Sequence, residues 1–110
     1  MENCLFCKMI EGEIPTQKVY EDDQIFVIKD IHPKAKVHLL VIPKLHLDSL
    51  NEAKEEHAPL LGYMLSSLKN FAHEQGLDSF RTVVNTGKGS GQEIFHLHLH
   101  LLGGGNLPKF

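Results

Sequence analysis

The chain of 110 residues has no tryptophan, only two cysteines and no run of basic residues. Its lysines and arginines are scattered and its net charge is -3, which argues against a DNA- or RNA-binding chain that must cover a phosphate backbone. The apolar runs are only a few residues long, whereas a helix needs about 20 apolar residues to cross a bilayer. We therefore expect no nucleic-acid partner and no membrane-spanning segment.

The beginning of the sequence, Met1-Glu2-Asn3-Cys4, has no basic region followed by an apolar stretch, so no secretory signal is expected. We therefore expect a cytoplasmic location, in which the two cysteines stay reduced. A chain of this length with 42% hydrophobic residues can form one domain, residues 1–110, but not two. Because small domains often gain stability by pairing with a second copy, we expect a homodimer.

Apolar periodicity predicts two helices. Residues 3–12 carry apolar side chains at helical spacing and end at Gly12, which predicts a short helix. A longer apolar stripe predicts the main helix at about 52–75, with Pro59 tolerated only in its first turn and Gly76 as its cap. Alternating or β-branched segments predict strands at 19–20, 24–31, 37–42, 81–85 and 93–102. The predicted fold is α+β: an antiparallel meander sheet with one long helix and a short N-terminal helix, the last two strands forming a hairpin.

Three histidines near the end of the chain alternate with leucines. His96, His98 and His100 are separated by single leucines, and this period of two is typical of a β-strand. The leucines should face the core, while the imidazoles form a row on the other face at intervals of roughly 6.5 to 7 Å.

The histidine row allows two kinds of chemistry besides a plain strand face. Imidazoles at HxH spacing can bind zinc, and a neutral imidazole can attack phosphorus to form a covalent intermediate. The glycine-rich turn at residues 86–91 precedes the row, and its backbone N–H groups could approach a phosphate. Cys4-x-x-Cys7 adds an ambiguous pair, which suits zinc, redox chemistry or neither.

Residues 96–102 match the H-φ-H-φ-H-φ-φ motif of the histidine triad (HIT) family, in which φ is an apolar residue. The chain resembles the nucleotide-binding, phosphoramidase (HINT-like) branch of that family over residues 6–104. The other segments that carry the resemblance are Asp30-Ile31, His38-Leu39-Leu40-Val41-Ile42-Pro43-Lys44, Val84-Asn85, Gly91-Gln92 and Leu102-Gly103-Gly104.

The resemblance implies roles for the catalytic histidines. His98 would be the nucleophile that attacks the α-phosphorus of a nucleoside 5′-phosphoramidate, giving a nucleotidyl-histidine that water then hydrolyses. His100 would hydrogen-bond the phosphate oxygens or the leaving group, and His38 would fix the orientation and tautomer of His98. His96 completes the triad.

The resemblance also implies a purine nucleotide site. Asp30 would accept both ribose hydroxyls, while the phosphate would be held by Asn85, Gly91, Gln92 and the backbone N–H of Glu93. Glu93 stands where some relatives have Ser or Thr, so a hydroxyl contact there is absent. The purine would be enclosed by apolar side chains, namely Phe6, Ile14, Ile28 and Ile31.

Relatives with the N-terminal cysteine pair hold a structural zinc, and the corresponding ligands here would be Cys4, Cys7, His46 and His96. Catalysis would need no metal.

The resemblance therefore implies a purine nucleoside phosphoramidase. The alternatives are a dinucleoside polyphosphate hydrolase or nucleotidyl transferase of another branch, and a nucleotide-binding module with vestigial activity. The sequence ends soon after Gly105, where relatives usually carry a longer tail, so the preferred leaving group stays open.

Overall fold

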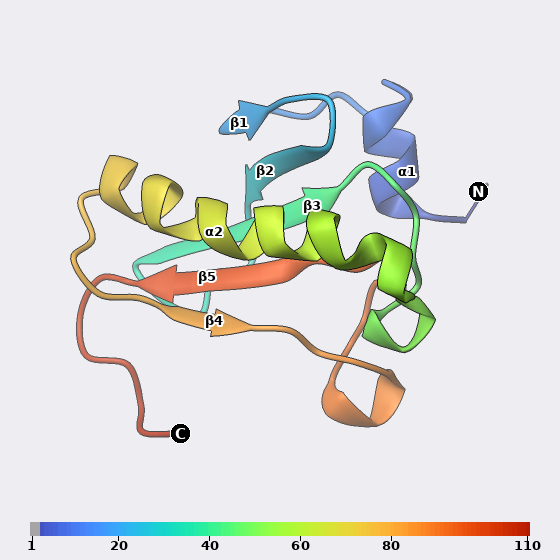
Figure 1. Cartoon of the computed structure of the whole chain (residues 1–110). Coiled ribbons are helices and arrows are strands. Elements are labelled where there is room, and N and C mark those ends of the chain that lie inside the picture. The colour runs from blue at the N-terminus through green and yellow to red at the C-terminus, as the bar shows by residue number, and fades with distance from the viewer. Residues whose placement is uncertain (1–2) are drawn as a thin grey trace.

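The structure, a computed structural model, describes residues 3–110; residues 1 and 2, which belong to the predicted domain, lie outside the described residues. Its centre is a five-stranded antiparallel sheet crossed by one long helix, with a short helix near the N-terminus (Figure 1). This arrangement confirms the predicted α+β class. In chain order the elements are α1 (Leu5–Ile10), β1 (Tyr20–Glu21), β2 (Ile25–Lys29), β3 (Val37–Pro43), α2 (Ala58–Glu74), β4 (Arg81–Val83) and β5 (Leu99–Gly103).

The strand order in the sheet is β1-β2-β3-β5-β4, and every neighbouring pair is antiparallel. The first three strands form the predicted meander, and the predicted antiparallel pairing of the last two strands is also confirmed; only the step from β3 to β4 departs from a simple meander. After β3 the chain passes through α2 to the far edge of the sheet, and β5 then returns between β3 and β4. The last strand thus pairs with both neighbours, with Leu40 opposite His100 on one side and Val83 opposite His100 on the other.

The two faces of the sheet carry two separate apolar clusters, because successive side chains of a strand point to opposite faces. One face packs against α2, which crosses β3 and β5 (Figure 1) and buries Leu99 and Leu101 of the last strand. The other face packs against the N-terminal helix and buries Phe6 between the strands and α1. The leucines occupy the core as predicted, and the histidine face is itself largely covered.

The main helix begins later than its apolar stripe predicts. Residues 50–52 and 55–57 form two separate 3₁₀ turns, and the regular helix starts at Ala58. Pro59 lies in the first helical turn, where its missing N–H is not needed. At the other end Gly76 adopts a left-handed φ of 78°, and the Leu77 N–H bonds to the Ala72 carbonyl at 2.9 Å, which caps the helix as predicted. Among residues 3–110, no helix combines the length and apolar character needed to cross a bilayer.

The histidine-bearing strand is shorter than the predicted 93–102. Only residues 99–103 belong to β5, so His96 and His98 lie on the segment that leads into the strand. The Leu97 N–H donates to the Leu47 carbonyl at 2.7 Å instead of joining the ladder with β3. The pairing of β5 with β3 begins at Leu99, opposite Val41, and the preceding histidines are held by side-chain and loop contacts.

Candidate functional site

A cavity of about 490 Å³ opens on the histidine face of the sheet. Its walls come from α1, from the ends of β2 and β3, from β5 and from the loop before β5. The predicted site residues that line it are Phe6, Ile28, Asp30, Ile31, His38, Asn85, Gly91, Glu93, His98 and His100. The structure therefore brings residues from five separate parts of the chain to one hollow.

His98 presents one ring nitrogen to this cavity. Its Nδ1–H donates to the backbone carbonyl of His96 at 2.7 Å, so the neutral ring carries its lone pair on Nε2. The ring of Phe6 packs edge-on against it with ring centroids 5.2 Å apart. Burial lowers the pKa of His98 below its ordinary value of 6.5, against the opposing effect of the carbonyl hydrogen bond. A buried, neutral and oriented imidazole is suited to attack an electrophile.

His38 and His100 form a hydrogen-bonded pair beside His98. The Lys34 N–H donates to His38 Nδ1 at 3.0 Å, so the proton of a neutral His38 resides on Nε2. That nitrogen lies 2.9 Å from His100 Nδ1 and 3.4 Å from a carboxylate oxygen of Asp30. His100 therefore accepts at Nδ1 and keeps its own proton on Nε2. Burial, followed by the neighbouring His98 and His38, lowers the pKa of His100 to about 4.

This geometry differs from the predicted role of His38. The residue contacts His100 and Asp30, while the tautomer of His98 is fixed by the carbonyl of His96. The reason is the register of the sheet, which places Leu40 opposite His100 and leaves His38 near that histidine and away from the segment before β5.

Gln92 also has a different role from the predicted phosphate contact. Its buried side chain accepts from the Gly87 N–H at 2.8 Å and donates to the carbonyls of Asp48 and Ile94 at 2.7 and 3.0 Å. Because these bonds use both ends of the side-chain amide, Gln92 supports the glycine-rich turn and does not line the cavity. Gly91 adopts φ 103°, a conformation that favours glycine, and turns the chain toward the cavity.

The apolar wall of the cavity differs from the prediction at two places. Ile14 does not line the cavity, whereas Met9 of α1 does. The helical spacing of Phe6 and Met9 was a signal for this second residue, because side chains three apart lie on one helix face. Ile31 is 86% exposed at the rim of the cavity. Ile94 and Lys34 also line it, and no sequence pattern distinguished them.

A second cluster of side chains lies beside His98 and consists of Cys4, Cys7, His46 and His96. Their sulfur and Nδ1 atoms lie within 4.8 Å of one another, with His46 Nδ1 3.0 Å from His96 Nδ1. The Cys4 sulfur is 3.3 Å from His96 Nδ1, and the Cys7 sulfur is 3.3 Å from His46 Nδ1. These four residues come from the start of α1, the loop after β3 and the segment before β5.

The hydrogen bonds of the two imidazoles show that this donor set fits a metal. His46 Nε2–H donates to the Asp48 carboxylate and His96 Nε2–H to the Pro43 carbonyl, each at 2.7 Å. Both Nδ1 lone pairs of the neutral rings therefore face each other across 3.0 Å, and a cation between them relieves that repulsion. Two thiolates and two imidazoles are a ligand set that zinc prefers in closed tetrahedral sites.

A second group of potential metal ligands, with three ligand atoms within 4.8 Å of one another, consists of Asp30, His38 and His100. The hydrogen bonds of this group do not fit a metal site. His38 receives an N–H at Nδ1, so its Nε2 carries a proton and has no lone pair for a metal. The two clusters therefore differ in chemistry: one fits a metal, and the other is a hydrogen-bonded chain that ends in the cavity.

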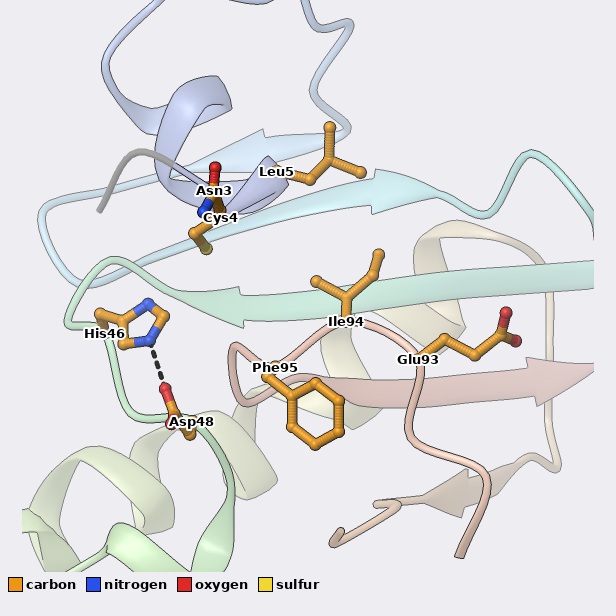
Figure 2. A pocket seen from close by; sticks show the side chains of 8 residues that line it. All are labelled: Asn3, Cys4, Leu5, His46, Asp48, Glu93, Ile94 and Phe95. Atoms are coloured by element: carbon orange, nitrogen blue, oxygen red, sulfur yellow. Dashed lines mark hydrogen bonds and ion pairs between the residues drawn. The ribbon is translucent and has the colours of Figure 1, made fainter. Parts of the chain in front are cut away.

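A second hollow of about 530 Å³ lies beside the metal-compatible cluster and shares Leu5, Glu93 and Ile94 with the first (Figure 2). Figure 2 shows the side chain of Glu93 extending away from His46 and Asp48, in the direction in which β5 runs. The carboxylate of Glu93 therefore points away from His46 and Asp48, and Glu93 also lines the cavity that holds His98 and His100.

Relatives in sequence match this chain over nearly its whole length. The family model described as "Scavenger mRNA decapping enzyme C-term binding" matches residues 3–107. Protein HitA of Neisseria gonorrhoeae is 55% identical over 104 residues, covering 94% of this chain and 97% of that protein. A purine nucleoside phosphoramidase of Escherichia coli (strain K12) is 39% identical over 105 residues, covering 94% of this chain and 88% of that protein.

Solved structures share the fold as well. A HIT family hydrolase from Legionella pneumophila matches with a TM-score of 0.93 at 44% identity, covering 96% of each chain. A zinc-bound histidine triad family protein from Mycobacterium smegmatis matches with a TM-score of 0.79 at 32% identity, covering 92% of this chain and 74% of that chain. With two of the three histidines lining a cavity in the same fold, the chain belongs to the histidine triad (HIT) family of hydrolases.

Proposed function

We propose that this protein hydrolyses purine nucleoside 5′-phosphoramidates through a covalent nucleotidyl intermediate on His98. The observation that carries the proposal is the Nδ1–H bond from His98 to the His96 carbonyl, which leaves the Nε2 lone pair facing the cavity. The Escherichia coli relative named purine nucleoside phosphoramidase supports the same class of reaction.

The reaction has two balanced steps. His98 Nε2 forms a bond to the α-phosphorus, the P–N bond breaks, and the nitrogen takes up a proton and leaves as an amine. Water then attacks the phosphorus and releases His98 with its lone pair. One proton of that water replaces the proton taken up by the amine, and the other is retained by the product, a nucleoside monophosphate. The Nε2–H of His100 is available as a donor to a phosphoryl oxygen or to the leaving nitrogen.

The cavity walls suit a purine nucleotide. Phe6 and Ile28 supply buried apolar surface for the base, and Ile31 supplies exposed apolar surface at the rim. The Asp30 carboxylate lines the same cavity and can accept hydrogen bonds from a ribose diol. Asn85 and the backbone around Gly91 would bind the phosphate and stabilise the charge that develops on its oxygens.

Replacing the nucleophile tests this proposal. His98→Gly should abolish hydrolysis of adenosine 5′-phosphoramidate while AMP still binds, and mass spectrometry of the wild type during turnover should detect a nucleotidyl adduct. The matched control is His73→Gln, because His73 is exposed on α2, outside the residues that line the cavity. Retained turnover in His98→Gly would refute the mechanism.

Two other activities are distinguished by their products. Preferred hydrolysis of dinucleoside polyphosphates such as Ap₃A or Ap₄A would assign the chain to another HIT activity. Tight AMP binding with negligible turnover on every phosphoramidate would indicate a nucleotide-binding module.

We also propose a structural zinc ion held by Cys4, Cys7, His46 and His96. When bound, zinc would join the N-terminal segment to the loop after β3 and to the segment that carries the nucleophile. Support comes from the facing Nδ1 lone pairs and from the zinc-bound Mycobacterium smegmatis relative. Metal analysis should give about one zinc per chain, and chelation should lower the thermal unfolding temperature. Cys7→Ser should lose most of the zinc, whereas the control His57→Gln should retain it.

Homodimer formation and a cytoplasmic location stay predictions. The outer edge of β4 has no neighbouring strand within residues 3–110, and Leu65 of α2 is 55% exposed, so both offer surface to a second copy. Light scattering coupled to size-exclusion chromatography should give twice the mass of one chain.

A further inference from the structure

Glu93 is a carboxylate placed at the active-site cavity without a protein partner. It lines the cavity together with His98 and His100 and is exposed. Within residues 3–110, no hydrogen bond or ion pair engages its carboxylate, in contrast to Asp30, which accepts the His32 N–H at 2.8 Å and faces His38. Its charge is therefore available to whatever occupies the cavity.

We propose that Glu93 selects the leaving group, favouring phosphoramidates of amines that carry positive charge and disfavouring leaving groups that carry negative charge. The inference rests on the proposed function, because it concerns the same site and names its substrate class more narrowly.

The backbone beside Glu93 is held in place by its neighbour. The three hydrogen bonds of the buried Gln92 side chain join the turn at Gly87, the loop at Asp48 and the carbonyl of Ile94. Residue 93 thus lies between two residues held by hydrogen bonds, and its side chain extends away from His46 and Asp48 (Figure 2). A fixed backbone keeps the carboxylate on the wall of the cavity that His98 and His100 also line.

Two lysines also line the cavity, Lys29 at the end of β2 and Lys34 in the loop that follows it, and within residues 3–110 neither forms an ion pair with Glu93. The Lys34 ammonium donates to the His32 carbonyl at 3.1 Å, in the loop that also carries Asp30. Glu93 comes from the loop before β5, on another wall of the cavity.

The Glu93 carboxylate, added to that of Asp30 and to the charge of a bound phosphate, repels negatively charged groups and attracts positively charged ones. Because a carboxylate cannot donate a hydrogen bond to phosphate oxygens, its favourable partner is the departing amine or a cationic group attached to it. The same charge disfavours a polyphosphate leaving group, so Glu93 would also separate phosphoramidates from dinucleoside polyphosphates.

The test compares three adenosine 5′-phosphoramidates whose amines have similar length: 1,4-diaminobutane, butylamine and 4-aminobutyrate. Values of kcat/KM are measured for the wild type, for Glu93→Gln and for a control, Glu55→Gln, which removes an exposed carboxylate of the 3₁₀ turn before α2. Because ratios between substrates are compared, a uniform loss of activity in a variant cancels.

The wild type and the control should prefer the diamine over butylamine by about two- to fivefold, the range expected of an exposed charge pair, and should disfavour the carboxylate by a similar factor. Glu93→Gln should bring both ratios close to one, and added salt should weaken the wild-type preference. Equal ratios in the wild type, or ratios unchanged in Glu93→Gln, would overturn the inference while leaving the proposed function intact. No hydrolysis of any of the three by the wild type would refute the proposed function itself, and the inference with it.

Discussion

The low pKa of His100 predicts that this histidine makes the protein sensitive to acid. Its pKa falls from the usual 6.5 to about 4, chiefly because burial disfavours the charged ring. Between these two values the unfolded chain binds a proton at this position and the folded chain does not. Stability from this group is therefore complete above the unfolded pKa of 6.5 and is lost as pH falls toward 4.

The size of the effect follows from the shift. Each pKa unit corresponds to about 1.4 kcal/mol, so His100 should contribute a loss of about 2 to 3 kcal/mol in unfolding free energy between about pH 7.5 and 4. His100→Asn removes the titrating ring, while its side-chain oxygen can still accept from His38 Nε2–H. The variant should therefore lose less stability than the wild type over the same pH range.

Urea unfolding followed by circular dichroism at a series of pH values between about 7.5 and 4 measures this difference. The burial of His38 and His98 lowers their pKa values as well, so the variant keeps a residual slope and the wild type has the steeper one. His73→Gln, which replaces an exposed histidine, should follow the wild type. Parallel curves for the wild type and His100→Asn would refute the argument that this ring is held neutral by burial.

Two further stability predictions concern hydrogen bonds outside the reacting groups. Tyr63→Phe removes a donor to the Asp22 carboxylate and should lower the unfolding free energy by about 1 kcal/mol, measured by urea unfolding at neutral pH; an unchanged midpoint would show that the bond contributes nothing. Gln92→Ala should cost about 2 kcal/mol or more and raise KM for a phosphoramidate, because a buried side chain that joins Gly87, Asp48 and Ile94 is lost. Gln92→Glu should be no better, since a carboxylate would face two carbonyl oxygens; rescue by this variant would contradict the assignment of the donors.

The sheet and helices follow from the sequence where a local pattern sets them. The apolar stripe and Gly76 specify the main helix and its end, and the β-branched segments specify β2 and β3. The position of β5 between β3 and β4 has no local signal, because it depends on how far α2 carries the chain across the sheet. Similarly, the early end of the ladder depends on a contact between Leu97 and Leu47, which are 50 positions apart.

The sequence predicts which residues form the candidate site better than it predicts the contacts that each of them makes. Asp30, Asn85 and Glu93 line one cavity together with three of the predicted histidines, His38, His98 and His100, whereas His96 lies outside it. The partner of each side chain depends on register and on loop closure, which no motif encodes. Gln92 shows this most clearly, since its position in the motif suggested a phosphate contact, whereas its amide group bonds to the backbone at Gly87, Asp48 and Ile94.

His96 contacts both the metal-compatible cluster and His98, and it uses different atoms for each contact. Its ring joins Cys4, Cys7 and His46 through Nδ1, while its backbone carbonyl fixes the tautomer of His98. The ring is fully buried, with Nε2–H bonded to the Pro43 carbonyl where β3 ends, so its backbone cannot move without disturbing all of these contacts. Because the ladder of β5 begins only at Leu99, this anchoring holds His98 in place as strand pairing holds His100. The triad histidine whose ring lies outside the cavity is thus the one that orients the ring of His98.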